Sequence, residues 1–298
     1  MTQLQATLAT ESASGKASVS RPGWVQACVL AGLILLLYYS ILGRLVQDWL
    51  HDDNFSHGLF VPLFSAFVVW QNKDRLLAMP ARPAWFGGVV IIGALGLLVV
   101  GVLGSELFLS RTSLLFLLAG IVLFFRGWAT FRAVLFPWCF LFLMVPIPAI
   151  IFNRITFPLQ LLASQLATAL LPIFNVPVLR QGNVIQLPAM QLEVAEACSG
   201  IRSLMSLGTL SIIYGYFLES KLAARVLLAI AAVPIAVAAN ALRIVGTGLM
   251  VQYWDPDKAL GFFHEFSGWV IFVISLLMLF AVHSLTRLLF RLKSRRAS

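Results

Sequence analysis

The sequence predicts an all-α polytopic membrane protein with about eight transmembrane helices. Of its 298 residues, 60% are hydrophobic and only 11% are charged, whereas soluble domains carry roughly 25% charged residues. A chain this apolar could not cover a water-soluble core with polar surface. Its apolar residues also gather in runs of about 20, the length of helix that crosses a hydrocarbon core of about 30 Å. The bilayer is therefore the expected solvent.

The apolar runs define the expected elements in chain order. An Ala/Ser/Thr-rich N-terminal tail, residues 1–23, is expected to be disordered in the cytoplasm. A single transmembrane domain, residues 24–290, follows, and a basic cytoplasmic tail, residues 291–298, comes last. The first apolar run lacks a small-residue cleavage site and is longer than a signal-peptide core, so it is expected to be retained. The eight expected spans are 24–42, 55–70, 85–103, 107–125, 133–151, 199–218, 222–245 and 266–289.

Two segments between the spans have a different character. Residues 155–174 contain Pro158, Gln160 and Pro172, which suits an interfacial or re-entrant helix on the outer face; a ninth full span is the alternative. Residues 176–197 are not membrane-like and alternate apolar and polar residues. This pattern predicts two short strands joined by a proline turn, forming a small extracytoplasmic β-like cap.

The distribution of basic residues predicts the orientation. Cytoplasmic loops are enriched in Lys and Arg, and both chain ends are expected to lie inside. This arrangement places 14 of the 21 basic residues on the inner side with three acidic ones, Glu11, Asp74 and Glu219, and leaves seven basic and nine acidic residues outside. The net charge of +9 then reflects loops held at an anionic leaflet, and no basic stripe with interleaved aromatics indicates nucleic acid. The inner basic residues are Lys16, Arg21, Lys73, Arg75, Arg82, Arg126, Arg132, Lys221, Arg225, Arg287, Arg291, Lys293, Arg295 and Arg296.

Cys198 is the first candidate for chemistry. It opens the expected span 199–218 in the segment Glu-Ala-Cys-Ser-Gly-Ile-Arg, beside Ser199. The positive end of a helix dipole lowers a thiol pKa, and Arg202, four residues on, shares its helix face. A small apolar residue at a helix start is the alternative reading.

Arg243 and His264 are the second and third candidates. Arg243 follows Arg225 by 18 residues, about 27 Å of helix, so it lies near the outer surface with Asn240 on the same face. It could stabilise an oxyanion or clamp a carboxylate, or simply extend toward lipid headgroups. His264 begins the last span and could act as a general base, or be an interfacial histidine. The topology brings both to the outer face with Cys198, and Cys, His and Arg together form an acyl-transfer set.

A further outer cluster, Asp-Asp-Asn-Phe-Ser-His-Gly at residues 52–58, opens the second span. Its Ser56 and His57 could orient the base or bind substrate, and a solvated loop with a helix cap is the alternative. No metal-ligand spacing or phosphate-binding glycine loop is present, so neither a metal nor another cofactor is expected.

These segments resemble the exosortase/archaeosortase family, and the bacterial exosortases most, including the exopolysaccharide-associated subgroup. The resemblance rests on Ala-Cys-Ser-Gly-Ile-Arg-Ser-Leu at 197–204, Asn-Ala-Leu-Arg-Ile at 240–244, His-Glu-Phe-Ser-Gly-Trp at 264–269 and Asn-Phe-Ser-His-Gly at 54–58. It covers nearly the whole chain apart from the N-terminal tail and the basic C-terminal end.

The resemblance implies a catalytic Cys198, Arg243 and His264, eight spans, and a place in the inner (cytoplasmic) membrane with the site on the periplasmic side. It implies substrates anchored by a C-terminal PEP-CTERM signal, which comprises a Pro-Glu-Pro motif, an apolar helix and a basic cluster. The resemblance further implies that the enzyme cleaves such signals and transfers the new C-terminus to an acceptor that the sequence does not identify.

Two other classes of membrane protein remain open at the level of sequence. A transporter or polysaccharide-export component would use Arg243 and His264 as pathway charges, although it favours polar residues at mid-membrane. A polysaccharide polymerase also works at the outer face but needs no cysteine. Sensitivity of the activity to alkylation of Cys198 discriminates between these classes.

Overall fold

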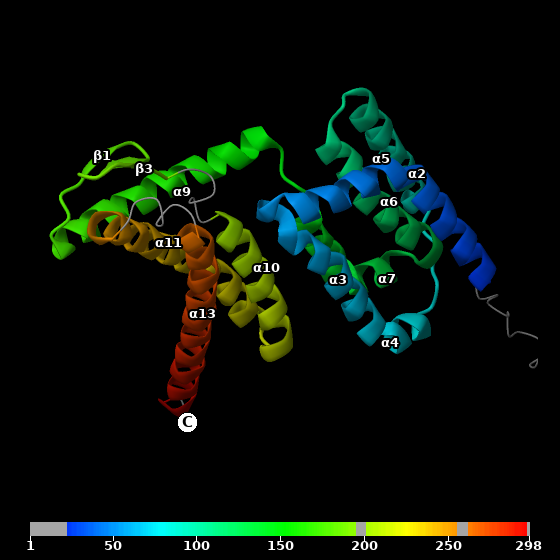
Figure 1. Cartoon of the computed structure of the whole chain (residues 1–298). Helices are drawn as coiled ribbons and strands as arrows, with labels where there is room; N and C mark the ends of the chain where they lie inside the picture. Colours follow the sequence, from blue (N-terminus) through cyan, green and yellow to red (C-terminus); the bar gives the residue numbers. More distant parts are fainter. Residues whose placement is uncertain (1–22, 195–200, 255–261, 297–298) are drawn as a thin grey trace, which may run out of the picture. The chain divides into compact units, whose positions relative to one another are not determined.

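The computed structural model describes residues 23–194, 201–254 and 262–296. The chain forms two compact units, residues 1–43 and 44–298. The first unit contains the N-terminal part of helix α2 (Trp24–His51), and the second contains every other element described below (Figure 1).

Helices of very different lengths make up most of the second unit, and short 3-10 helices (η) connect several of them. In chain order after α2 they are η1 (Asp53–Leu59), α3 (Phe60–Gln71), α4 (Lys73–Ala78), α5 (Phe86–Leu103), α6 (Leu107–Arg126), α7 (Trp128–Ala133), α8 (Leu135–Phe140), η2 (Leu141–Met144), α9 (Ala149–Leu170), η3 (Leu171–Phe174), α10 (Ile201–Leu218), α11 (Leu222–Tyr253) and α13 (Phe262–Arg296).

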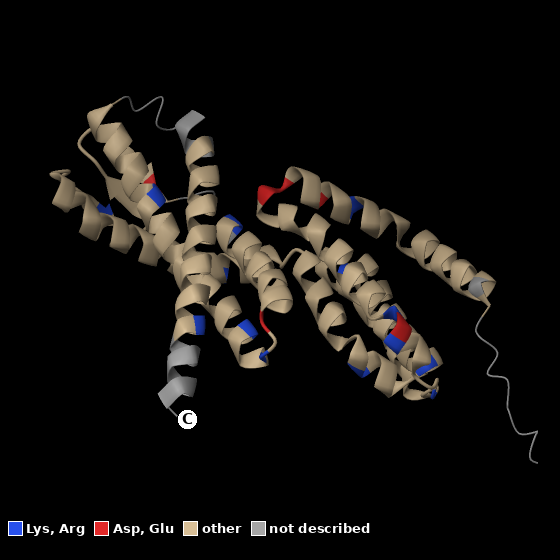
Figure 2. Ribbon diagram, turned by 90° about the horizontal axis from the view of Figure 1, so that it is seen from below, with Lys and Arg blue, Asp and Glu red and all other residues tan. Residues whose placement is uncertain are grey.

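Within the described residues, six helical segments are long and apolar enough to cross a membrane. Figure 2 shows the corresponding long stretches of uncharged helix, with Lys and Arg gathered mostly toward helix ends. The prediction of a mostly helical, multi-pass membrane protein is confirmed, with six candidate spans rather than about eight. They are Val25–His51, Phe86–Leu103, Leu107–Arg126, Ala149–Phe174, Leu222–Tyr253 and Phe266–Leu288.

The expected span 133–151 is wrong as a single helix. Its residues are divided among α7, α8, η2 and the start of α9. The break follows Met144, where Val145 is extended (φ −89°, ψ 117°) immediately before Pro146. A residue before proline is pushed out of the helical region, and proline cannot donate the hydrogen bond that would continue the helix.

Three other expected segments also differ in part. Residues 55–70 begin in η1 and contribute an α-helix, α3, of only 12 residues. The expected span 199–218 corresponds to α10, which has 18 residues and is not among the six candidates. Residues 155–174, expected to be interfacial, belong to the 26-residue segment Ala149–Phe174, which qualifies as a candidate span by length and composition. That finding favours the alternative of a full span for this segment.

The extended cap is an antiparallel sheet of three strands, β1 (Leu179–Gln181), β2 (Val184–Gln186) and β3 (Gln191–Glu193), in the order β1-β2-β3. A tight turn joins β1 to β2, and Gly182 adopts there a φ of +65° that favours glycine. The expected alternation is confirmed, because Ile185 and Leu192 are paired across the strands and buried. They pack in one core with Ala163 and Ala167 of α9 and with Ile244 and Val251 of α11.

A second core joins α10, α11 and α13, the three helices that follow the sheet. Leu207 of α10, Leu228 of α11 and Leu279 of α13 are almost fully buried together. Alanines at 232 and 236 bring the backbone of α11 close to its neighbours. This bundle positions the C-terminal candidate residues.

Candidate active site

The segment 52–58 forms a defined structure rather than a loose loop. It is the 3-10 helix η1, and the Asp52 carboxylate caps its start by accepting from the Asn54 backbone N–H at 2.9 Å. The Ser56 hydroxyl donates to the Asp53 carbonyl at 3.1 Å. The predicted cap is therefore confirmed, and it leaves the Asp53 carboxylate available for a contact outside η1.

Gly58 lies where no side chain can fit. A Cβ added to it would lie 2.3 Å from Nε1 of Trp49, far inside van der Waals contact. The same indole N–H is buried and donates to the Met144 carbonyl at 2.9 Å. The close approach of η1 to α2 at this point explains why a glycine follows His57.

His57 is a buried histidine, only 6% exposed. Its Nε2 lies 3.2 Å from the Leu143 carbonyl; because a carbonyl only accepts, Nε2 carries the proton. Burial lowers the pKa of His57, and the nearby carbonyls of Leu143 and Asn54 offset this in part. Burial therefore favours the neutral imidazole, and its Nδ1 has no hydrogen-bond partner of good geometry.

Arg202 of α10 meets η1 through an ion pair. Its Nη2 lies 2.7 Å from Oδ2 of Asp53, with the two side chains 49% and 68% exposed. An exposed pair of this kind contributes little to stability, about 0–1 kcal/mol. The ion pair does, however, join the cluster at 52–58 to α10, the helix that follows Cys198 in the sequence.

Arg243 contacts the last helix. Its Nε donates to the Ser267 hydroxyl of α13 at 3.2 Å, and the guanidinium lies against Gly268, where an added Cβ would be 3.6 Å from Nη2. One turn earlier on α11, Asn240 is 2% exposed and its Nδ2 has no partner. Sequence reasoning did not assign Ser267 a role, although its spacing of three residues from His264 puts both on one face of a helix.

Cys198 and Ser199 lie outside the described residues, and His264 is described only through the helical backbone of α13. The predicted meeting of Cys198, Arg243 and His264 therefore stays a prediction. The elements that carry or adjoin these residues are packed together: η1 contacts α10, α10 contacts α11 and α13, and α11 contacts α13.

A separate polar cluster lies at the other end of α10. His283 of α13 lies between the Tyr214 hydroxyl and the Glu219 carboxylate, 2.6 Å from each. Arg287 donates from Nε to the same carboxylate at 2.9 Å. The hydrogen bond from His283 is the largest cause of a lowered pKa of Glu219, and the Arg287 guanidinium lowers it further. The cluster ties the turn after α10 to α13.

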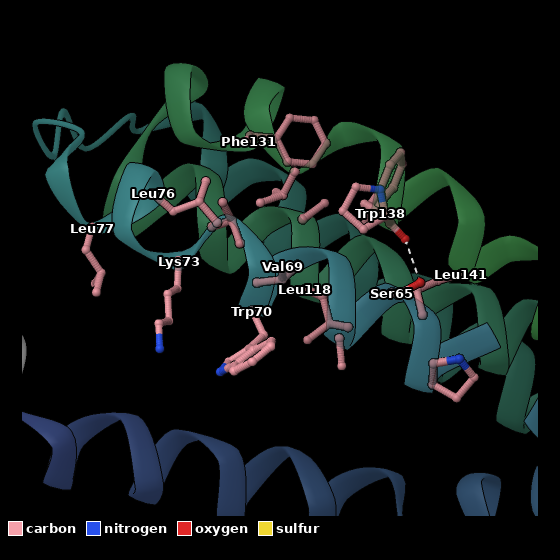
Figure 3. Close-up of a pocket in the computed structure, with 16 residues that line it drawn as sticks. Ser65, Val69, Trp70, Lys73, Leu76, Leu77, Leu118, Phe131, Trp138 and Leu141 are labelled. Atoms are coloured by element: carbon pink, nitrogen blue, oxygen red, sulfur yellow. Dashed lines mark hydrogen bonds between the residues drawn. The ribbon is translucent and has the colours of Figure 1, made fainter. Parts of the chain in front are cut away.

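A cavity beside α3 and α4 is lined by none of the candidate residues. It has a volume of about 610 Å³ and mostly apolar walls from α3, α4, α6, α7 and α8. Figure 3 shows Trp70 and Lys73 at one side of it and the Ser65 hydroxyl donating to the Pro137 carbonyl at 3.1 Å. The Lys73 ammonium lies 5.2 Å from the centre of the Trp70 ring.

The comparison with family models finds a match, which covers most of the chain. Residues 49–281 match the family model described as Transmembrane exosortase (Exosortase_EpsH). The matched region includes Cys198, Arg243, His264 and the 52–58 cluster. No curated protein and no solved structure matches the chain.

Proposed function

The chain belongs to the transmembrane exosortase family, and we propose that it is a membrane-embedded cysteine peptidase and transpeptidase. In this proposal it cleaves the C-terminal PEP-CTERM sorting signals of exported proteins at the extracytoplasmic face of the cytoplasmic membrane. It then transfers the new C-terminus to an acceptor nucleophile. Family membership supports the substrate class, and the arrangement around Arg243 supports the chemistry.

The observation that carries the proposal is the contact between Arg243 and Ser267. Ser267 follows His264 by three residues on α13, which is about one helical turn. The contact therefore sets the Arg243 guanidinium within about one turn of the proposed general acid. A fixed cation beside a proton donor is what a developing oxyanion and a leaving amine require.

The reaction assigns one role to each residue. The Cys198 thiolate attacks the peptide carbonyl at the sorting motif, and Arg243, with Arg202, stabilises the negative oxygen of the tetrahedral intermediate. His264 donates a proton to the leaving amine as the C–N bond breaks, which leaves a thioester on Cys198. An acceptor nucleophile then attacks the thioester, gives its proton to His264 and releases the thiolate. Four further residues are assigned to binding or positioning the substrate: Asn240, Ser199, Ser56 and His57.

The long-range polar contacts support the proposal that the catalytic residues lie on the outer side of the membrane. Asp53 with Arg202, and Arg243 with Ser267, each join two residues that the charge pattern assigns to the outer side. Glu219 with Arg287 joins two residues that it assigns to the inner side. The Arg126 guanidinium likewise donates to the Leu76 carbonyl, between two expected inner loops. No contact in this set crosses from one assigned side to the other.

The test is processing of a tagged PEP-CTERM substrate in membranes that contain Cys198→Ala. We expect uncleaved substrate to accumulate, and Cys198→Ser to be at least a hundredfold slower, since the nucleophile is lost or weakened. Cys28→Ala and Cys139→Ala are matched controls, because both thiols are free and exposed, and they should process normally. Processing at the normal rate by Cys198→Ala, or after alkylation of Cys198, would overturn the thioester mechanism and favour the polymerase class.

A further inference from the structure

The extended cap has two edge strands, β1 and β3, because its strand order is β1-β2-β3 (Figure 1). An edge strand can bind an extended peptide, which adds a strand to the sheet through main-chain hydrogen bonds. Cys198 follows Glu193, the last residue of β3, by five residues, and five residues span at most about 18 Å. The cap is therefore close enough to the proposed nucleophile to hold a substrate for it.

The register of the sheet identifies the free main-chain groups of β1. Gln181 pairs with Val184 across a turn of two residues, and Leu179 pairs with Gln186. The residues that flank such a turn are hydrogen-bonded to each other, and hydrogen-bonded pairs alternate with non-hydrogen-bonded pairs along an antiparallel ladder. Arg180 lies between two hydrogen-bonded pairs and therefore directs its N–H and C=O away from β2. No described part of the chain pairs with these two groups.

A single residue with an outward N–H and C=O restricts the peptide that can pair with β1. In an antiparallel pair, one residue of the peptide exchanges both hydrogen bonds with the residue opposite, while its two neighbours direct their main-chain groups away. Proline has no N–H and is tolerated in an edge strand at such positions. A residue that precedes proline is also held in the extended region. The sequence Pro-Glu-Pro fits this pattern, because only its glutamate needs to donate.

The charge of Arg180 favours an acidic residue at the paired position. All three residues of β1 are exposed, and Nη1 of Arg180 donates to the Gly182 carbonyl at 3.1 Å. That contact holds the side chain at the edge of the sheet and leaves the rest of the guanidinium for a carboxylate. A glutamate directly opposite Arg180 forms a cross-strand pair of opposite charge, which stabilises strand pairing.

The opposite edge of the sheet, β3, is less suited to an acidic peptide. The Val194 N–H donates to the Asn183 carbonyl at 2.9 Å, so the preceding residue, Glu193, directs its main-chain groups away from β2. A peptide added to β3 therefore meets the Glu193 carboxylate beside its own glutamate, and like charges on opposite residues destabilise strand pairing. The two edges thus differ in charge, and β1 is the one that complements Pro-Glu-Pro.

We propose that the edge of β1 binds the Pro-Glu-Pro motif of the sorting signal as a fourth, antiparallel strand. The glutamate N–H donates to the Arg180 carbonyl, the Arg180 N–H donates to the glutamate carbonyl, and the guanidinium pairs with the glutamate carboxylate. The last proline lies opposite Leu179, whose exposed side chain packs against the ring. The inference rests on the proposed function and adds to it how the motif is recognised. Arg180 is a specificity-determining residue in this arrangement and takes no part in the chemistry.

Charge reversal on both partners tests the pairing. Arg180→Glu should slow cleavage of a Pro-Glu-Pro substrate about tenfold, because two carboxylates then lie opposite each other. A Pro-Lys-Pro substrate should be cleaved several-fold faster than Pro-Glu-Pro by this variant and more slowly by the unmodified enzyme. Arg154→Glu is the matched control, since Arg154 is an exposed arginine of α9, and it should treat both substrates as the unmodified enzyme does.

The outcomes separate this inference from the proposed function. A normal rate on Pro-Glu-Pro in Arg180→Glu, or no gain on Pro-Lys-Pro, would overturn the inference and reduce Arg180 to a charge that protects an edge strand from aggregation. Cleavage of Pro-Glu-Pro by the unmodified enzyme would leave the proposed function standing in either case. Absence of that cleavage would contradict the proposed function itself.

Photo-crosslinking in Cys198→Ala, in which substrate should stay uncut, tests the location. A benzoylphenylalanine in place of Leu179 should crosslink to the Pro-Glu-Pro tripeptide, as mapped by mass spectrometry. One in place of Glu193 lies three strand spacings from the bound peptide, about 14 Å, and should not react with the tripeptide. Reaction of the tripeptide from position 193, or no reaction from position 179, would contradict binding at β1.

Discussion

The Arg243 guanidinium donates from Nε to the Ser267 hydroxyl, 3.2 Å away, and so joins α11 to the helix that carries His264. The partner hydroxyl belongs to a helix position one turn from the proposed acid. The Arg243 side chain thus joins two helices that are distant in sequence. The position of the guanidinium, rather than its charge alone, is expected to matter for the reaction.

Ser267→Ala should therefore slow processing by about tenfold. The Arg243 guanidinium would lose the hydrogen bond that fixes its position, and a hydrogen bond from a charged donor contributes about 1.5–3 kcal/mol. Ser267→Thr keeps the hydroxyl and should retain most of the rate. The measurement is the initial rate of substrate cleavage in membranes at matched protein levels. Similar losses in both variants would indicate that side-chain size, rather than the hydroxyl, is what matters.

Gly58→Ala should disrupt the cluster at 52–58. The new methyl group would occupy the position of the Trp49 indole, and moving that ring breaks its hydrogen bond to the Met144 carbonyl. We expect a loss of unfolding free energy of about 1–3 kcal/mol together with reduced processing, measured by thermal unfolding in detergent. Gly93→Ala, with no atom within 4 Å of the added Cβ, is the matched control and should be neutral or slightly stabilising. An unchanged melting temperature for Gly58→Ala would contradict the assigned packing.

Asp48→Ala should destabilise the protein more than Asp53→Ala. Asp48 pairs at 2.5 Å with Arg111, a side chain that is 3% exposed inside the candidate span Leu107–Arg126. Removing the carboxylate leaves a buried charge uncompensated, at a cost of about 3 kcal/mol. The exposed pair of Asp53 with Arg202 should contribute only about 0–1 kcal/mol. Chemical unfolding of the two variants in the same detergent compares them, and equal effects would refute the buried pair.

Glu219 should make stability depend on acid pH. His283 and Arg287 hold the pKa of this carboxylate below its ordinary value of 4.5, so the ionised form is favoured in the folded state. The resulting stabilisation is present above the ordinary pKa and is lost as pH falls through the lower folded value. Melting temperature should fall between about pH 5 and about pH 3, and Glu219→Gln should reduce that part of the slope. An identical slope in the variant would show that other groups control the transition.

The extended cap illustrates how far sequence patterns reach. Alternation around Ile185 and Leu192 predicted β2 and β3, because one face of each strand is buried. The strand β1 was missed because Leu179, Arg180 and Gln181 are all exposed, so no alternation marks them. A fully exposed strand such as β1 is defined by its hydrogen bonds to β2, which the periodicity of the sequence does not report.

The candidate site shows a similar division. Arg202, Arg243, Asn240 and His57 were selected as chemically unusual residues in an apolar chain, and their motifs carried the family resemblance. Ser267 was not assigned a role, since a hydroxyl group is a common feature of an apolar helix. Arg111 was counted only as an outer charge, and its burial against Asp48 became evident only from the packing of α6.

The sequence by itself determined that the chain is a membrane protein and which family it belongs to. It also predicted the side of the membrane on which each charged residue lies. These conclusions follow from composition, motif spacing and the order of Lys and Arg along the chain, all of which are properties of the chain before it folds. Tertiary structure decided that helices break at Val145 and Pro146, that Asp53 meets Arg202, and that Arg243 meets Ser267. Such contacts depend on how helices pack and rotate against one another, and a local pattern along one helix carries no information about its partner.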